Sequence, residues 1–165
     1  DEFNSGTIEI LKTKPLSDWQ IVLGKFFASI VLVIIALLPT LTYAFTVYQL
    51  GNPIGNLDVG STIGSYLGLL FLAATYTAIG LFTSTLSNNQ IVAFVLSVFI
   101  VFALFYGFDA MSSMFKNSEY LVQQFGINEH FKSISRGVID TRDVLYFVSV
   151  TFFFLFITKQ QLKNE

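Results

Sequence analysis

The chain has no cysteine, a single histidine and few charged residues. Without cysteine it can form neither disulfides nor thiolate metal sites, and a cysteine nucleophile is excluded. The one histidine, His130, rules out an H-E-x-x-H zinc pair, and as a lone loop histidine we expect it to be solvated. Neither a G-x-x-x-x-G-K-[ST] phosphate loop nor a G-x-S-x-G elbow occurs. The sequence therefore predicts no catalytic, metal or cofactor site.

Charge is also scarce, and this decides the class of protein. Only 12% of the 165 residues are charged, whereas soluble domains carry about 25%. Hydrophobic residues make up 53%, including 19 Phe, so a water-soluble surface is not available. The net charge of −2, without a basic tract, argues against nucleic-acid binding. We predict an all-α, integral membrane helical bundle embedded in the lipid bilayer.

Four apolar stretches account for most of the chain, at residues 25–48, 62–82, 91–108 and 142–158. A helix needs about 20 apolar residues to cross a bilayer. The last stretch is only just long enough and needs Arg142 and Lys159 to reach outward at its ends, so a re-entrant segment is the alternative. The cores of these spans carry no Asp, Glu, Lys, Arg or His, which argues against proton- or ion-coupled transport.

The segments between the spans carry start signals for helices. Ser17 and Gln20 have the spacing of a capping box, which Ser87 and Gln90 repeat, and Asp140 or Thr141 can cap the last helix. Residues 109–140 are amphipathic. We expect two helices there, Met111–Phe125 and Ile127–Ile134, lying on the membrane surface.

Two features within the spans suggest packing and bending. Gly60, Gly64 and Gly68 recur every four residues, which lets another helix approach closely; we prefer this interpretation to a substrate groove on the same face. Pro39 interrupts the first span and predicts a kink, either as an ordinary membrane proline or as a gating hinge.

The distribution of lysine predicts the orientation. Lys12, Lys14 and Lys25 flank the first span and Lys159 and Lys163 follow the last, whereas the first loop has no basic residue. The positive-inside rule therefore places both termini in the cytoplasm. Four basic residues in the third loop favour the opposite topology. That topology would place the five lysines near the termini outside the cell, so it is the less favourable one.

The polar lead-in before the first span carries the most informative motif. Residues 1–24 contain E-x-x-x-G-T-I-E-I-L, then T-K-P-L-S, and the first span comes next. This pattern resembles the cytoplasmic coupling region of type-2 ABC exporter permeases. Further matches, such as Tyr48–Pro53, Tyr76–Phe82 and Ser133–Asp143, are similar to gliding-motility permeases of Bacteroidetes. Phe3 and Asn4 depart from the pattern, because the family usually has basic residues after the motif glutamate.

The resemblance implies one permease domain over residues 1–165, in the bacterial inner membrane. It implies a separate ATP-binding subunit and no ATPase site in this chain. The coupling contacts would be made by Glu2, Gly6, Thr7, Ile8, Glu9, Leu11 and Pro15. Family members act in pairs, which implies a homodimer, and residues 109–140 would face the periplasm, where an accessory subunit could sit. The family has six membrane helices, so we expect two upstream of this chain. A structural scaffold of a motility or secretion complex is the alternative function.

Overall fold

A computed structural model describes residues 16–114 and 119–164, and within them all regular structure is helical. The helices are α2 (Asp18–Leu37), η1 (Leu38–Thr40), α3 (Leu41–Leu50), α4 (Val59–Leu86), α5 (Gln90–Phe102), η2 (Ala103–Gly107), α6 (Phe108–Ser112), α7 (Glu119–Gln123), α8 (Ile127–Ser135) and α9 (Thr141–Asn164). Of these, η1 is a 3-10 turn and η2 is a π-helical segment. The prediction of an all-α fold is confirmed.

Four helical stretches are long and apolar enough to cross a membrane: Asp18–Leu50, Val59–Leu86, Gln90–Ser112 and Thr141–Lys163. Each predicted span lies inside one of these four stretches. The last stretch is one unbroken helix, α9, which is longer than the 142–158 segment and does not have the break that a re-entrant segment requires.

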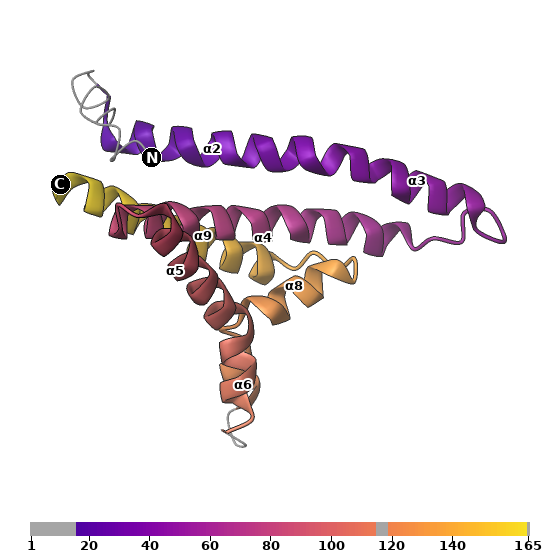
Figure 1. Cartoon of the computed structure of the whole chain (residues 1–165). Coiled ribbons are helices and arrows are strands. Elements are labelled where there is room, and N and C mark those ends of the chain that lie inside the picture. The colour runs from indigo at the N-terminus through magenta and orange to yellow at the C-terminus, as the bar shows by residue number, and fades with distance from the viewer. Residues whose placement is uncertain (1–15, 115–118, 165) are drawn as a thin grey trace.

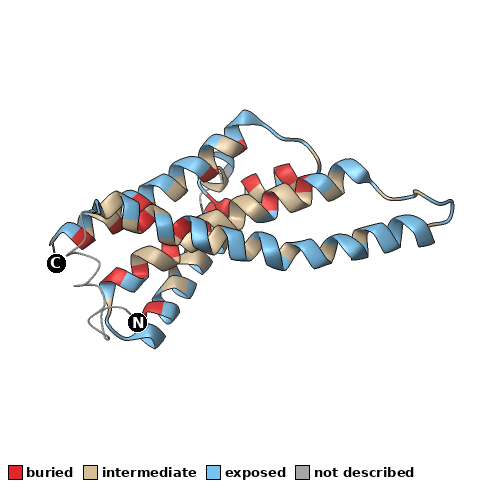
Figure 2. Ribbon diagram, turned by 90° about the horizontal axis from the view of Figure 1, so that it is seen from above, coloured by how far each residue is buried: buried red, intermediate tan, exposed pale blue. Residues whose placement is uncertain are grey.

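Helix α4 occupies the centre of the bundle. It packs against α2, α5, α8 and α9. Figure 1 shows α2 and α3 running along one side of α4, while α5 and α6 turn away from the long helices. The start of α2 and the end of α9 lie at the same end of the molecule. Most of the α2–α3 surface is exposed (Figure 2), as expected for helices that face lipid.

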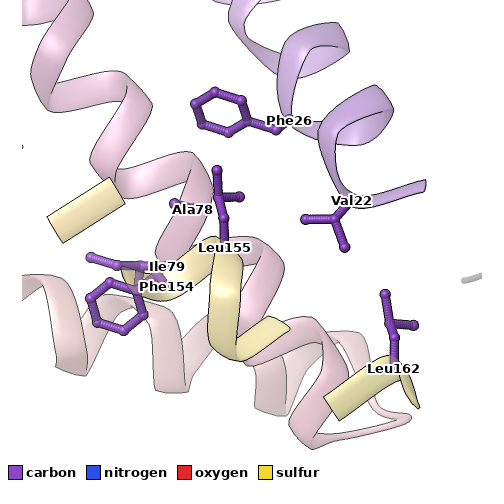
Figure 3. Close-up of a cluster of buried hydrophobic side chains, with 7 residues drawn as sticks. All are labelled: Val22, Phe26, Ala78, Ile79, Phe154, Leu155 and Leu162. Atoms are coloured by element: carbon purple, nitrogen blue, oxygen red, sulfur yellow. The ribbon is translucent and has the colours of Figure 1, made fainter. Parts of the chain in front are cut away.

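Two groups of buried apolar side chains hold the helices together. The first, which we call the apolar cluster, joins α2, α4 and α9 (Figure 3) and consists of Val22, Phe26, Ala78, Ile79, Phe154, Leu155 and Leu162. The second, which we call the α8 cluster, consists of Ile127 and Ile134 of α8 and Phe147 of α9. The two clusters lie towards opposite ends of α9.

The capping predictions had mixed outcomes. The capping box of α2 is confirmed, because the Gln20 amide donates to Ser17 Oγ at 3.4 Å and the Ser17 amide donates to Gln20 Oε1 at 2.9 Å. The box predicted at Ser87 is wrong. Asn89 caps α5 instead, since its Oδ1 accepts from the Ile91 amide at 2.9 Å, and Ser87 Oγ accepts from the Asn89 amide. For α9, Asp140 Oδ1 accepts from the Arg142 amide at 3.0 Å.

The region after the third span differs from the prediction. The third long helix continues through the π segment to Ser112, so Met111 belongs to it and no single helix covers Met111–Phe125. Helix α8 forms close to the predicted range, but Ile127 and Ile134 are fully buried against α4 and α9. The amphipathic pattern is the same for a helix on lipid and a helix on protein, and here the glycines of α4 provide the protein surface.

Candidate functional site

The predicted coupling residues precede the described part of the chain. Glu2, Gly6, Thr7, Ile8, Glu9, Leu11 and Pro15 lie outside the described residues. The structure does describe the start of α2, which comes directly after them in the chain, and its attachment to the bundle.

The start of α2 is fastened to α9. The Trp19 ring stacks on Phe152 with 6.0 Å between ring centroids, and Lys159 Nζ lies 5.4 Å from the centre of the Trp19 ring, as in a cation–π contact. Val22 and Phe26, one and two turns further on, are buried in the apolar cluster. The first turns of α2 therefore cannot move far without moving α9 or breaking these contacts.

The second half of this first long helix is attached far less firmly. Helix α3 has no buried residue, and the connection to α4 near its start is a hydrogen bond of 2.9 Å between Thr40 Oγ1 and Tyr66 Oη. Pro39 lies in the 3-10 turn where α2 ends. Two hydroxyls bond to the backbone around this turn: Thr40 Oγ1 donates to the Leu37 carbonyl, and Thr42 Oγ1 donates to the Pro39 carbonyl.

The glycine row of α4 faces the end of α8 and the turn after it. A Cβ on Gly64 would overlap the carbonyl oxygen of Ile134 and lie 2.8 Å from Gly137 Cα. Gly137 has a φ of +87°, a conformation that suits glycine, and a Cβ on it would lie 2.7 Å from the Gly60 carbonyl carbon. A Cβ on Gly68 would lie 3.2 Å from the Phe131 ring. In this structure α8 and its turn occupy the face where a substrate groove was the alternative.

Serine hydroxyls reinforce this close approach. Ser61 Oγ donates to the Ser135 carbonyl at 2.9 Å, and Ser65 Oγ donates to the same oxygen at 3.4 Å. These bonds satisfy a carbonyl at the C-terminal end of α8 that has no partner within its own helix.

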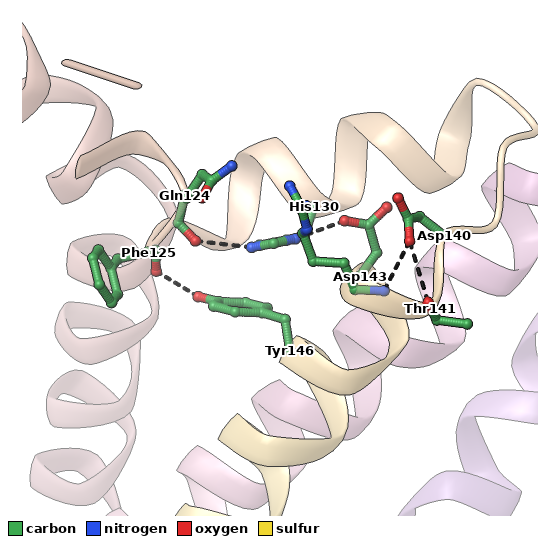
Figure 4. A network of polar contacts seen from close by, with 8 residues as sticks. Gln124, Phe125, His130, Asp140, Thr141, Asp143 and Tyr146 are labelled. Atoms are coloured by element: carbon green, nitrogen blue, oxygen red, sulfur yellow. Dashed lines mark hydrogen bonds and ion pairs between the residues drawn. The ribbon is translucent and has the colours of Figure 1, made fainter. Parts of the chain in front are cut away.

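His130 is the site residue that sequence reasoning misjudged. It was expected to be solvated, but only 6% of its surface is exposed. Its Nε2 donates to the Gln124 carbonyl at 2.9 Å, and its Nδ1 lies 2.7 Å from Asp143 Oδ1. Its ring stacks on Tyr146 with 3.9 Å between centroids. Figure 4 shows how this network joins the segment before α8 to the first turns of α9.

The sequence did hold one signal for this burial. His130 is three residues after Ile127 and four before Ile134, which places all three on one face of α8. The apolar stripe could thus have placed His130 inside. Its partner Asp143 lies 13 residues away across a turn, and nothing in the spacing predicts that pairing.

A small polar cavity of about 160 Å³ opens beside this network. Its lining residues come from α7, α8, the start of α9 and the segments that connect them, and are Tyr120, Gln123, Gln124, Glu129, His130, Ser133, Asp140, Arg142 and Asp143. Over residues 16–114 and 119–164, no group of three or more His, Cys, Asp or Glu side chains is arranged to hold a metal ion.

Four long apolar helical stretches, with α4 at their centre, define a multi-pass α-helical membrane protein. The family model for the ABC-2 family transporter protein matches residues 1–162. The chain therefore belongs to the ABC-2 transporter family, whose members are membrane permease subunits that are generally not catalytic themselves. Membership implies an ATP-binding partner subunit. No curated protein and no solved structure matches the chain.

Proposed function

We propose that this permease transmits the closure of a separate ATPase subunit to the membrane helices through the start of α2, and that it serves gliding motility. The ABC-2 family match supports the role as permease and the existence of the partner. The resemblance of several segments to gliding-motility permeases supports the more specific process. The observation that carries the coupling mechanism is the attachment of the first turns of α2 to α9.

A force that enters at the lead-in meets a stiff joint. The capping box at Ser17 and Gln20 satisfies backbone groups that would otherwise fray. One residue inside the helix, Trp19 contacts both Phe152 and Lys159 of α9. Displacement of residues 1–15 is therefore passed on rather than absorbed at the junction.

From this joint the displacement has a packed route to the centre of the bundle. Val22 and Phe26 lie in one cluster with Ala78 and Ile79 of α4 and with Leu155 of α9. Ala78 and Ile79 are fully buried. Helix α3, the far half of the first long helix, buries no residue, so it can follow the displacement of α2.

On this proposal Glu2, Gly6, Thr7, Ile8, Glu9, Leu11 and Pro15 contact the ATPase, and both termini are cytoplasmic. The α8 cluster then lies toward the periplasmic side, because it is at the opposite end of α9 from the apolar cluster. External labelling of Lys12 or Lys14 in intact cells tests this orientation. Labelling from outside would place the lead-in on the wrong face for an ATPase.

The decisive experiment compares charge reversals at two ends of the full-length protein. We expect Glu9→Arg, and separately Gly6→Trp, to abolish co-purification of the ATP-binding subunit and to stop gliding. Glu129→Arg is the matched control, because Glu129 is a partly exposed residue of α8, away from the lead-in. Retention of both ATPase binding and motility in Glu9→Arg and Gly6→Trp would overturn the proposal.

The scaffold alternative finds less support. A scaffold that bound a partner protein through the face of Gly60, Gly64 and Gly68 would need that face free, but α8 and its turn cover it. A scaffold would also assemble independently of nucleotide. ATPase activity of the purified complex that changes when the lead-in is mutated favours the permease, and unchanged activity with defective assembly favours the scaffold.

A further inference from the structure

We propose that His130 and Asp143 form a proton-binding clamp: a proton held by the pair fastens the segment that begins α8 to α9, and loss of that proton releases it. Such a clamp would regulate the permease whatever process the permease serves.

The hydrogen-bond geometry fixes how many protons the pair holds. A backbone carbonyl can only accept, so Nε2 of His130 must carry a hydrogen towards Gln124. On the other side of the ring, Nδ1 and Asp143 Oδ1 are 2.7 Å apart, and a hydrogen must lie between them. The pair therefore holds two protons, as an imidazolium beside a carboxylate or as a neutral ring beside a carboxylic acid.

Removing one proton breaks one of these two bonds. A neutral ring beside an ionised carboxylate has a single N–H, so it would turn a lone pair towards either Asp143 or the Gln124 carbonyl. Both side chains are only 7% exposed, so water cannot readily replace the lost partner. In the described part of the chain the second carboxylate oxygen, Oδ2, is buried and accepts no hydrogen bond from protein groups.

Tyr146 completes the attachment. Its ring stacks on the imidazole at 3.9 Å, an arrangement that favours a cationic ring. Its hydroxyl donates to the Phe125 carbonyl at 2.6 Å. The carbonyls of Gln124 and Phe125 are thus both linked to α9. The His130–Asp143 pair links the Gln124 carbonyl, and the Tyr146 hydroxyl, which stays protonated near neutral pH, links the Phe125 carbonyl. Loss of the proton loosens the first tie and leaves the second.

The surrounding charges do not substitute for the pair. The other titratable and charged groups near it are Tyr120, Glu129, Lys132, Asp140, Arg142 and, through a hydrogen bond to Asn128, Asp109. Glu129 and Lys132 face each other at 3.5 Å and are 40% and 48% exposed, so solvent screens them. Asp140 accepts the Arg142 amide as a helix cap. Among the described residues, Asp143 makes the ion pair with His130.

Counting protons gives the sign of the pH effect. In the released state the two side chains no longer contact each other. Near neutral pH a separate histidine is mostly neutral and a separate aspartate is ionised, so the two side chains hold one proton in total. The clamped pair holds two, so the clamped state binds more protons than the released state. Rising pH therefore weakens the clamp, and falling pH strengthens it.

The first test observes the ring directly. In the full-length protein in lipid nanodiscs, labelled with ¹⁵N-histidine, the His130 signals are assigned by their loss in His130→Gln. At about pH 6, we expect hydrogen-bonded protons on both sides of the ring. A ring with one N–H beside an ionised carboxylate at that pH would overturn the proposal.

The second test observes release. Hydrogen exchange of backbone amides in residues 124–135, corrected for intrinsic rates, is expected to rise about tenfold between pH 6 and pH 9, which corresponds to losing one buried hydrogen bond. His130→Gln and Asp143→Asn are expected to remove this pH dependence, and Lys132→Gln, at the neighbouring exposed pair, to keep it. Flat exchange in the unmutated protein, or an unchanged pH response in Asp143→Asn, would overturn the proposal. If a variant does not fold, the titration of the unmutated protein still decides.

Discussion

The apolar cluster and the α8 cluster hold the same two helices, α4 and α9, by different means. The apolar cluster consists of apolar side-chain contacts, and one turn away a hydrogen bond of 3.1 Å between Thr75 Oγ1 and Thr151 Oγ1 also joins α4 and α9. Because lipid tails are as apolar as leucine, apolar contacts give little preference for one exact arrangement in a bilayer. The α8 cluster adds backbone approaches at Gly64 and Gly137 and directed hydrogen bonds from Ser61 and His130. The first end therefore holds its helices mainly by apolar contacts, whereas the second adds close backbone packing and directed hydrogen bonds.

This difference matters for a protein driven from one end. On the proposed mechanism, force enters beside the apolar cluster, whose side chains pass it from α2 to α4 and α9. On the same proposal, the α8 cluster holds the other end of α9 in place while the start of α2 moves. Its polar bonds make it specific, and the His130–Asp143 pair makes it responsive to protons. Four substitutions test this contrast, two at the α8 end and two in the first long helix, from the largest expected effect to the smallest.

The largest effect is expected from a single methyl group at Gly64. Gly64→Ala places a Cβ against the backbone of Ile134 and Gly137, which cannot rotate aside as a side chain could. We expect a loss of about 4 kcal/mol or more in stability, among the largest for one substitution. Thermal unfolding of the detergent-solubilised protein, monitored by size exclusion, measures it.

Gly80→Ala is the matched control for this comparison. It lies on the same helix, and a Cβ there meets nothing within 4 Å. Replacing glycine by alanine inside an open stretch of helix is expected to stabilise by about 0.5–1 kcal/mol. Equal melting temperatures for the two variants would show that the α8 cluster is not closely packed.

The second effect tests the apolar part of the α8 cluster. Phe147 is 1% exposed, stacks on Phe71 and meets Tyr146 edge-on. Phe147→Ala is expected to cost about 3 kcal/mol, the lower end of the range for soluble proteins, because acyl chains can fill part of the cavity. Phe153→Ala, on the same helix and 57% exposed, should cost far less. A similar loss in both variants would mean that burial in this bundle does not decide stability.

The two clusters also differ in how much of them the sequence foretells. The long apolar runs predict all four membrane-crossing stretches, and the spacing of Ser17 and Gln20 predicts the capped start of α2. These features depend on composition and on contacts three or four residues apart. The helices of the apolar cluster were therefore predictable, although the partners of Val22 and Phe26 were not.

The α8 cluster depends on contacts between residues far apart in the chain. The row of glycines indicated a close approach, but the partner, α8, lies some seventy residues further on, as the Ser61–Ser135 bond shows with its separation of 74. His130 was placed in solvent because its partner Asp143 comes after a turn whose geometry no local pattern sets. The same amphipathic stripe predicted a surface helix, since periodicity says which face is apolar and not what covers it.

The third effect is smaller and concerns the joint of α2. Ser17→Ala removes the hydroxyl that accepts the Gln20 amide. The expected cost is about 1 kcal/mol in stability. If the joint transmits force, we expect the coupled ATPase activity to fall by a larger fraction than the stability does. Transport-linked ATPase activity of the purified complex measures coupling. Thr46→Ala, an exposed hydroxyl in α3 that bonds only within its own helix, is the control. Intact coupling in Ser17→Ala would assign force transmission to Trp19 and its α9 contacts alone.

The smallest effect on stability, and the sharpest on mechanism, is expected at Pro39. It lies in the 3-10 turn between α2, which buries Val22 and Phe26 in its first half, and α3, which buries nothing. Pro39→Ala removes no buried contact, so stability should change by no more than about 0.5 kcal/mol.

The two interpretations of Pro39 then separate by activity. An ordinary membrane proline predicts unchanged ATPase-driven activity in Pro39→Ala. A hinge predicts reduced activity at unchanged stability, because a continuous helix would tie the free movement of α3 to the fastened start of α2. If Pro39 is a hinge, the first long helix has a fastened part, the start of α2, and a moving part, α3. The Thr40–Tyr66 hydrogen bond would then mark the boundary between these two parts.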